Sequence, residues 1–527
     1  SCSSVEPCRP PTRSLSAMRP AELGALRAPL GLALAVFWVG FYALLVQRQP
    51  RPEGLLASGL PRPWGQAFPH YAAAPPWPAV EWNVWQGWRD SLVSQLAFHA
   101  VFLVLSRLTR GGSPSEARGP WRLAIVGLVC CAALRGLLGA ALTVAVTGAF
   151  HCITICAPRR WVVPLAWLCA LLLMQTVFTL LVVDGDGPCL LERWLPFLAS
   201  LPKLVGIRGV MCWSTFRYDA LRLISFAADV TDAEAEPHFA SFLAYQLYPP
   251  LAPAGPVICY ADFAQQLSSP RPWPRRVVAK YLLQLGALLC LIEASMYVLY
   301  FPAWLGPQTS REGLLALPPW MLFGGIHWIL QFEWLSLTAV WRVTRGVALV
   351  DGIEAPEDML GTLCFPGSFK EVWRLWHASL NLWSVRYIYR PLGGRLRAWL
   401  AVPATFLFVA FWHDVRGFGD RPFWYVWAVL NSAFMLLESK ALGRTRTHRL
   451  PVALVAMLAA SSVLALVVAN MPALMYRNSF SIIWAIIFRE GSAALMVTLA
   501  LVFGAGAVFS ASSPELHAEE AGKRLAP

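Results

Sequence analysis

Charged side chains are scarce in this sequence, since Asp, Glu, Lys and Arg make up only 14% of its 527 residues. Soluble globular proteins carry about 25% charged residues. Hydrophobic residues make up 57% of the chain, and apolar runs recur from residue 29 to residue 510. This distribution excludes a soluble enzyme held by one anchor, and it predicts a polytopic membrane protein.

The twelve cysteines form no pattern typical of a zinc ribbon, a redox enzyme or a disulfide framework. There is no Cys-x-x-Cys pair, and most cysteines lie inside apolar runs, where they act as small hydrophobic residues. His151, Cys152 and Cys156 are close enough to suggest a metal site, but a fourth ligand is missing nearby. We therefore expect no metal and no permanently bound cofactor.

Several enzyme motifs are also missing. No His-x4-Asp follows any of the nine histidines, which disfavours the glycerolipid acyltransferases with soluble domains. There is no Asp-His-His-Cys of cysteine palmitoylation, no Gly-x-Ser-x-Gly elbow and no His-Glu-x-x-His zinc site. No internal repeat of the solenoid or propeller kind is visible, so we expect a single membrane domain over residues 29–510.

The charges that are present are mainly basic, and the formal net charge is +13. They cluster in the connections between apolar runs, as in the segment PRPWPRR at residues 270–276. Such clusters are typical of cytoplasmic loops and of contact with anionic lipid headgroups. We therefore expect membrane lipids as partners, and no nucleic acid.

The apolar runs predict an all-α protein with about eleven transmembrane helices, because about 20 apolar residues span a bilayer. Residues 123–156 are too long for one crossing, so we expect two short oblique spans broken near 135–139. The spans are predicted at about 29–47, 90–107, 123–156 (two spans), 162–183, 277–303, 316–342, 397–412, 421–439, 451–471 and 480–509. Residues 1–28 and 511–527 are predicted to be disordered, with Met18 as a candidate start.

Two stretches between these runs are not expected to form straight membrane helices. Residues 190–230 are mixed in character and predict an interfacial or re-entrant helix. The segment FLAYQLYPPLAPAGPVICYADF, at 242–263, is apolar but interrupted by prolines. Broken backbone at membrane depth occurs only where it is buried in protein or lines a cavity, so this segment points to a site inside the membrane.

Two histidines lie at the edges of segments that are apolar enough to cross a membrane. The segment FKEVWRLWHASLNLWSVRYIYRPLGG, at 369–394, predicts an amphipathic helix on which His377 and Asn381 share one face. His413 ends the apolar run VPATFLFVAFW, where an ionisable side chain marks either a functional site or a paired structural contact. His99 and His327 have similar surroundings in sequence, and we expect structural roles for them.

Five motifs occur in a fixed order along the chain. They are FRYDALRLISFAAD (216–229), YPPLAPAGPVICYADFAQQ (248–266), WRVTRGVALVDGIEAPEDML (341–360), the segment 369–394 and FVAFWHD (408–414). In these motifs the sequence resembles the membrane-bound O-acyltransferase superfamily, and within it the glycerol-uptake-named branch related to Hedgehog acyltransferase. The resemblance is strongest over residues 210–440, the implied catalytic core, and weak over the first 110.

The resemblance implies an enzyme of the endoplasmic reticulum membrane that moves a fatty acyl group from acyl-CoA, its co-substrate, to a hydroxyl acceptor. The lyso-lipid part of a glycosylphosphatidylinositol (GPI) anchor is the implied acceptor. His413 matches the family's catalytic histidine, and His377 is expected to face the same chamber. Our hypothesis makes His413 the general base, while His377, together with Asn381, orients the acceptor or polarises the thioester carbonyl.

Weaker candidates surround these two histidines. Arg374 and Arg386 are candidate partners for the phosphates of coenzyme A, and Trp376 is a further candidate for substrate binding. Asp414 either orients His413 or forms an exposed polar cap. We also expect the proline-rich segment and the 369–394 segment to pack around a water-accessible cavity that reaches His413.

Other functions stay open at this point. The acceptor is alternatively a neutral-lipid precursor or a lysophospholipid. A glycerol-uptake transporter is a different class, which the absence of an inverted repeat disfavours. A scaffold without activity is disfavoured by the two intact histidines. The sequence predicts neither the acyl chain length nor the oligomeric state.

Overall fold

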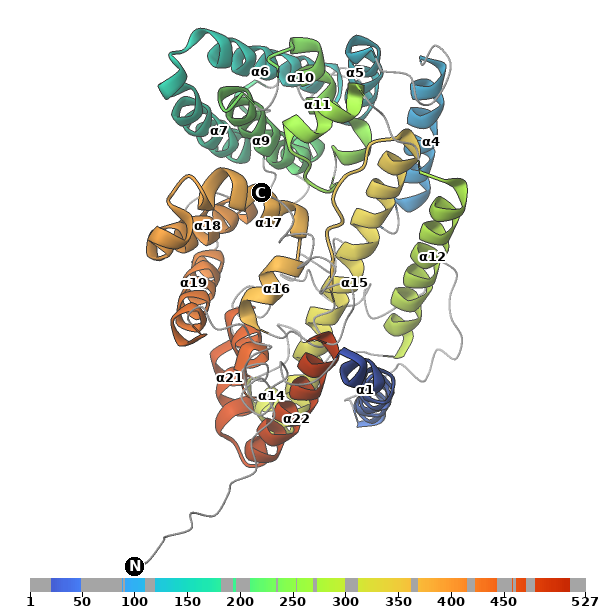
Figure 1. Cartoon of the computed structure of the whole chain (residues 1–527), viewed down its shortest axis with the longest axis vertical. Helices are drawn as coiled ribbons and strands as arrows, with labels where there is room; N and C mark the ends of the chain where they lie inside the picture. Colours follow the sequence, from blue (N-terminus) through green and yellow to red (C-terminus); the bar gives the residue numbers. More distant parts are fainter. Residues whose placement is uncertain are drawn as a thin grey trace, which may run out of the picture.

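A computed structural model describes residues 20–48, 88, 91–109, 119–181, 193–195, 209–233, 236–252, 254–268, 273–298, 311–361, 368–414, 422–442, 457, 461–470 and 479–511. Within these ranges the regular elements are all helices, and the described part of the chain contains no β-strand (Figure 1). The predicted all-α class is confirmed. Helix α1 (Pro20–Arg48) begins inside the segment predicted to be disordered, while residues 1–19 and 512–527 lie outside the described ranges.

Five described helices are long and apolar enough to cross a membrane. They are Pro29–Arg48, Leu137–Cys156, Arg159–Val177, Arg275–Ser295 and Gly394–His413. Shorter apolar helices, α4 (Leu92–Leu108) and Ser461–Asn470, fall where two further spans were predicted. The multi-pass character of the protein is confirmed, and the count of about eleven stays a prediction.

The predicted break within residues 123–156 is confirmed. Helix α5 (Pro120–Arg135) ends at Gly136, whose φ of 80° lies in a region that favours glycine, and α6 (Leu137–Cys156) follows at once. The segment predicted as one span over 480–509 is not a single straight helix. Helices α21 (Ser479–Phe488) and α22 (Ser492–Ala511) are bent by 84° at a short turn that contains Gly491, with a φ of 87°.

Helix α15 (Pro319–Asp351) is the central element, and it extends past the end predicted at 342. It crosses the middle of the molecule, from the upper helices to the lower group of α1, α14 (Arg311–Ala316), α21 and α22 (Figure 1). Its residues are buried almost all round, which is the pattern expected of a helix that is apolar on every face. It ends at Gly352, a left-handed cap with a φ of 86°.

A second group of helices lies above and beside α15 in Figure 1. Helix α9 (Gly209–Thr231) packs along α7 (Arg159–Leu181), and α10 (Phe239–Gln246) packs against α5. Helix α11 (Tyr260–Ser268) follows the proline-rich segment and packs against α10, while α12 (Arg275–Val298) packs along α15. Of residues 190–230, predicted to form an interfacial or re-entrant helix, the part from Gly209 forms one helix that is not among the candidate spans, while 190–192 and 196–208 lie outside the described residues.

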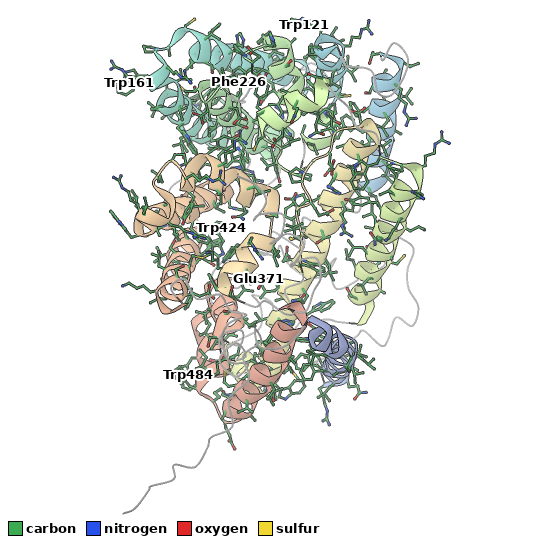
Figure 2. The ribbon with its side chains drawn as sticks, viewed as in Figure 1. Trp121, Trp161, Phe226, Glu371, Trp424 and Trp484 are labelled. Atoms are coloured by element: carbon green, nitrogen blue, oxygen red, sulfur yellow. The ribbon has the colours of Figure 1, made fainter. Side chains whose placement is uncertain are left out.

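Large apolar side chains cover much of the outer surface. Leu32 and Val39 on α1 are 67% and 71% exposed, and Leu283 on α12 is 75% exposed. Figure 2 shows Trp121 and Trp161 at the outer edge, and both are more than half exposed. A soluble monomer rarely exposes so much apolar surface, so this surface is suited to lipid contact.

Candidate active site

The helix predicted over 369–394 is broken at its centre. Helix α16 (Phe369–Leu375) ends before His377, and α17 (Ala378–Ser384) begins after it, followed by the π-helix η4 (Val385–Tyr389). His377 adopts a left-handed conformation with a φ of 44°, which is uncommon for a residue other than glycine. The predicted common helix face of His377 and Asn381 is therefore wrong, since His377 precedes α17 as its N-terminal cap.

Asp358 explains this break. Its carbonyl accepts the Ala378 N–H at 2.7 Å, and its carboxylate accepts the Ser379 N–H at 3.2 Å. These two N–H groups would otherwise continue the helix from α16, so the loop after α15 redirects the chain at His377. A left-handed residue of this kind costs of order 1–3 kcal/mol and persists only where its surroundings hold it.

The same carboxylate holds the His377 ring. Nδ1 of His377 lies 3.0 Å from Oδ1 of Asp358, and both side chains are buried. The ring also lies 4.2 Å from the indole of Trp341, on α15. Sequence reasoning missed Asp358. The one available signal was its place as the third acidic residue in the motif segment EAPED, which is too weak to indicate a partner.

His413 is the last residue of α18 (Ala398–His413). Its Nδ1 lies 2.8 Å from the carbonyl oxygen of Val409, one helical turn earlier. Its ring stacks on the indole of Trp424, with centroids 4.5 Å apart and planes at 23°. Figure 2 labels Trp424, on α19 (Pro422–Leu442), in the middle part of the molecule.

One indole connects the two histidines. The Trp412 ring centroid lies 6.4 Å from the ring of His377 and 4.8 Å from that of His413. The guanidinium carbon of Arg217, on α9, lies 5.2 Å from the same indole, whose Nε1 donates to the Arg217 carbonyl at 3.1 Å. We call Trp412, His377, His413 and Arg217 the Trp412 cluster. The structure thus brings the two predicted histidines together, and adds a cation that sequence reasoning missed.

The proline-rich segment packs directly against this region. The Val257 N–H donates to Oγ of Ser379, at the start of α17, over 2.8 Å. The turn η3 (Pro249–Leu251) is held by Arg222, which donates to the Leu251 carbonyl at 2.6 Å and the Gln246 carbonyl at 3.2 Å. The predicted contact between the two broken segments is confirmed, while the cavity between them stays a prediction.

The other predicted binding residues are less closely grouped. Arg386 lies 2.8 Å from the buried carboxylate of Asp229, on α9, so its charge has a partner within the protein. Arg374 is more exposed, at 47% of its side chain, and lies 3.8 Å from Glu371, which Figure 2 labels near α16. Asn381 is half-buried on α17, and Trp376 is half-buried at the end of α16.

Asp414 is fully buried, so the expectation of an exposed polar cap is wrong. Its carboxylate lies beside the hydroxyl of Tyr425, on α19. The contact that orients the imidazole of His413 through Nδ1 is the Val409 carbonyl. Asp414 therefore connects the end of α18 to α19, next to the histidine.

Cys259 is the cysteine on the proline-rich segment, and a thiol there raises the question of a covalent acyl-enzyme. Burial is the main cause that raises the pKa of Cys259, to about 12. At neutral pH the side chain is therefore a protonated thiol, and only the thiolate is a good nucleophile. Cys259 is therefore poorly suited to act as a nucleophile.

His327 and His99 have the surroundings of structural residues. Nδ1 of His327 lies 2.7 Å from the hydroxyl of Tyr42, and the ring stacks on Trp38 with centroids 4.5 Å apart. His99 is buried on α4. Both histidines lie on helices outside the Trp412 cluster.

Comparison with known proteins identifies the protein family that this sequence matches. The model of the membrane-bound O-acyltransferase family matches residues 159–488, which is more than half of the chain and includes both histidines. The membrane-bound O-acyltransferase GUP2 of Saccharomyces cerevisiae is 34% identical over 259 residues, covering 45% of this chain and 41% of the yeast protein. The membrane-bound O-acyltransferase gup1 of Schizosaccharomyces pombe is 30% identical over 277 residues, covering 47% and 44%.

A mammalian relative aligns over more of the chain. The protein-cysteine N-palmitoyltransferase HHAT of Mus musculus is 26% identical over 374 residues, which cover 68% of this chain and 70% of the mouse protein. The chain spans less than half the length of each of the two yeast relatives. The matched family range, residues 159–488, contains all four residues of the Trp412 cluster.

Proposed function

This chain belongs to the membrane-bound O-acyltransferase family, and we propose that it transfers a fatty acyl group from acyl-CoA to a hydroxyl group of a lipid. The observation that carries the proposal is the state of His413. Its Nδ1 faces a backbone carbonyl, which only accepts hydrogen bonds, so Nδ1 carries the proton and Nε2 keeps a lone pair. An imidazole of this kind, at the end of an apolar helix, is suited to general-base catalysis.

The proposed reaction takes place in one active site. Nε2 of His413 accepts the proton of the acceptor hydroxyl while the hydroxyl oxygen attacks the thioester carbonyl carbon. The carbonyl electron pair moves to its oxygen, which becomes an oxyanion. When the carbonyl re-forms, the carbon–sulfur bond breaks, and the coenzyme A thiolate leaves with the proton from Nε2. General-base assistance of this kind contributes about 10²–10⁴ in rate.

For the acceptor we propose the lyso-lipid part of a GPI anchor, in the endoplasmic reticulum membrane. Support comes from the resemblance to the glycerol-uptake-named branch and from two yeast relatives with that type of name. The donor is proposed to enter from the cytosolic side, where Arg374 is the candidate for a phosphate contact. Its 3.8 Å contact with Glu371 is an exposed ion pair, which holds the side chain only weakly.

The test is transfer of a radiolabelled acyl group from acyl-CoA by the purified full chain in lipid nanodiscs. Acceptors are a lyso-GPI lipid, a lysophospholipid, diacylglycerol and a peptide with a free N-terminus. We expect label on the lyso-GPI lipid with the wild type and none with His413→Ala. Equal labelling by the two proteins contradicts the proposed mechanism, and labelling of another acceptor corrects the substrate.

Protein N-acylation is the second candidate function, because the mouse HHAT alignment covers the largest share of this chain among the three relatives above. The stability of the product to alkali distinguishes these two candidate functions. An ester on a lipid hydroxyl is cleaved by mild alkali, whereas an amide on a peptide N-terminus is stable to it. Alkali-stable label on the peptide would replace the O-acylation proposal with this one.

A further inference from the structure

In both histidines of the Trp412 cluster, the ring N–H already donates a hydrogen bond within the protein. Nδ1 of His413 donates to the Val409 carbonyl, and Nδ1 of His377 faces the Asp358 carboxylate, which only accepts when ionised. A neutral imidazole has one N–H and one lone pair. In their neutral forms, both rings therefore present an acceptor at Nε2, and neither has an N–H left for a substrate oxygen.

Acyl transfer needs a donor at this place. Attack on the thioester puts negative charge on the carbonyl oxygen, and enzymes stabilise that charge with fixed donors in a site that excludes water. The expectation that His377 polarises the carbonyl does not fit its hydrogen bond to Asp358. His377 is suited instead to accept a hydrogen bond from a second donor group of the acceptor, since the reacting hydroxyl gives its one proton to His413.

Arg217 carries the missing type of group. A guanidinium is positively charged and has five N–H donors in one plane. The Arg217 guanidinium lies 5.2 Å from the Trp412 indole, the ring that also contacts His377 and His413. The Trp412 Nε1–H donates to the Arg217 carbonyl, so the indole is also held by the backbone of the residue that carries the cation.

The other arginines near the site have different contacts. Arg386 lies on the Asp229 carboxylate, and Arg222 donates to two carbonyls around the proline-rich turn. Arg374 is half exposed beside Glu371. Among the arginines discussed, Arg217 is the one whose guanidinium lies on the indole shared by both histidines.

We infer that Arg217 donates to the oxyanion that forms on the thioester carbonyl, and so acts as a catalytic residue of this chain. The inference rests on the proposed acyl transfer and deepens it. His413 takes the proton of the reacting hydroxyl, His377 accepts a hydrogen bond from a second donor group of the acceptor, and Arg217 stabilises the negative charge. The three roles then use one acceptor atom on each ring and the N–H donors of one cation.

Tyr218 offers a matched control. Its ring contacts Trp412 edge-on at 5.4 Å, and its hydroxyl accepts a hydrogen bond from Trp341, so it is a neutral neighbour of the same indole. Tyr218→Phe removes one hydroxyl while keeping the ring that packs on Trp412. Arg217→Met removes the guanidinium but keeps an unbranched chain, and Arg217→Lys keeps the charge without the planar fork.

The experiment compares turnover with binding in the full-length protein. We would measure kcat for labelled acyl-CoA, together with the Kd of an S-alkyl-CoA thioether, which has the head and tail of the donor but no carbonyl oxygen. Arg217→Met is expected to lower kcat by about 10²–10³, the usual loss for one oxyanion donor. Thioether binding should stay within about threefold of the wild type, because the ground-state ligand has no oxyanion to stabilise. Arg217→Lys should recover part of the lost kcat, and Tyr218→Phe should retain nearly all of it.

Three results would overturn the inference. The first is a kcat for Arg217→Met close to the wild-type value. The second is thioether binding that weakens as much as turnover in both Arg217 variants, which would assign the guanidinium to donor binding or to folding. The third is a loss in Tyr218→Phe as large as in Arg217→Met. Failure of the wild type to transfer any acyl group would instead contradict the proposed function, so the two failures are distinguishable.

Discussion

Asp358 and His377 form a buried pair in which the histidine Nδ1 lies 3.0 Å from a carboxylate oxygen. The side chains are only 1% and 8% exposed. The same carboxylate also accepts the N–H of Ser379, so one side chain sets both the tautomer of the ring and the direction of the backbone. A carboxylate that orients an imidazole in this way acts through the ring and makes Asp358 a positioning residue.

Substitutions of Asp358 should separate these contributions. Asp358→Asn keeps an oxygen that accepts from His377 and Ser379 but loses the charge, and we expect a loss of about tenfold in kcat. Asp358→Ala leaves those N–H groups without a buried acceptor, which costs about 1–3 kcal/mol for each group. It should lower both kcat and the melting temperature in detergent. Equal melting temperatures for Ala and the wild type would contradict the structural role of the pair.

His413→Ala should abolish acyl transfer while the protein keeps its folded yield. The substitution removes the general base but also the stacking contact with Trp424, so we expect only a small decrease in melting temperature. His151→Ala is a control on α6, since it removes another half-buried imidazole that contacts a backbone carbonyl. Residual activity above a few per cent in purified His413→Ala would show that another group takes the proton.

His377→Asn should be milder than His377→Leu. Asparagine still donates and accepts hydrogen bonds at this buried position, whereas leucine removes one of the two groups that contact the carboxylate of Asp358. Asparagine also tolerates the left-handed conformation that His377 adopts, while leucine is strained there. The measurement is kcat and melting temperature for both variants. Equal loss of kcat in the two would indicate that His377 itself transfers a proton.

The sequence predicted the features that depend on local composition. The apolar runs gave the positions of most helices, and the excess length of 123–156 indicated the break that occurs at Gly136. The break at His377 was not predictable from helical periodicity, because Asp358 causes it from a loop after α15. The same holds for Arg217, which lies far from Trp412 in the chain and meets it only through the packing of α9 and α18.

The last prediction concerns the support of the proline-rich turn. Arg222 is buried, lies 3.5 Å from Asp219, and donates to the carbonyls of Gln246 and Leu251. Arg222→Met would leave two carbonyls without these hydrogen bonds and a buried carboxylate with one cation fewer. Asp219 keeps its ion pair with Arg135, so the main loss is at the two carbonyls, at about 1–3 kcal/mol for each unsatisfied group. We therefore expect a large decrease in melting temperature.

Arg342→Met is the matched control for Arg222→Met. Arg342 forms a partly exposed ion pair with Glu357 at 3.2 Å, and exposed pairs contribute only about 0–1 kcal/mol. The melting temperature of the Arg342→Met variant should stay near that of the wild type. Because η3 packs next to the segment that bonds Ser379, Arg222→Met should also lower kcat in the protein that remains folded. If the two variants melt at the same temperature, the buried arginine does not hold the turn, and the geometry around His377 must depend on Asp358 alone.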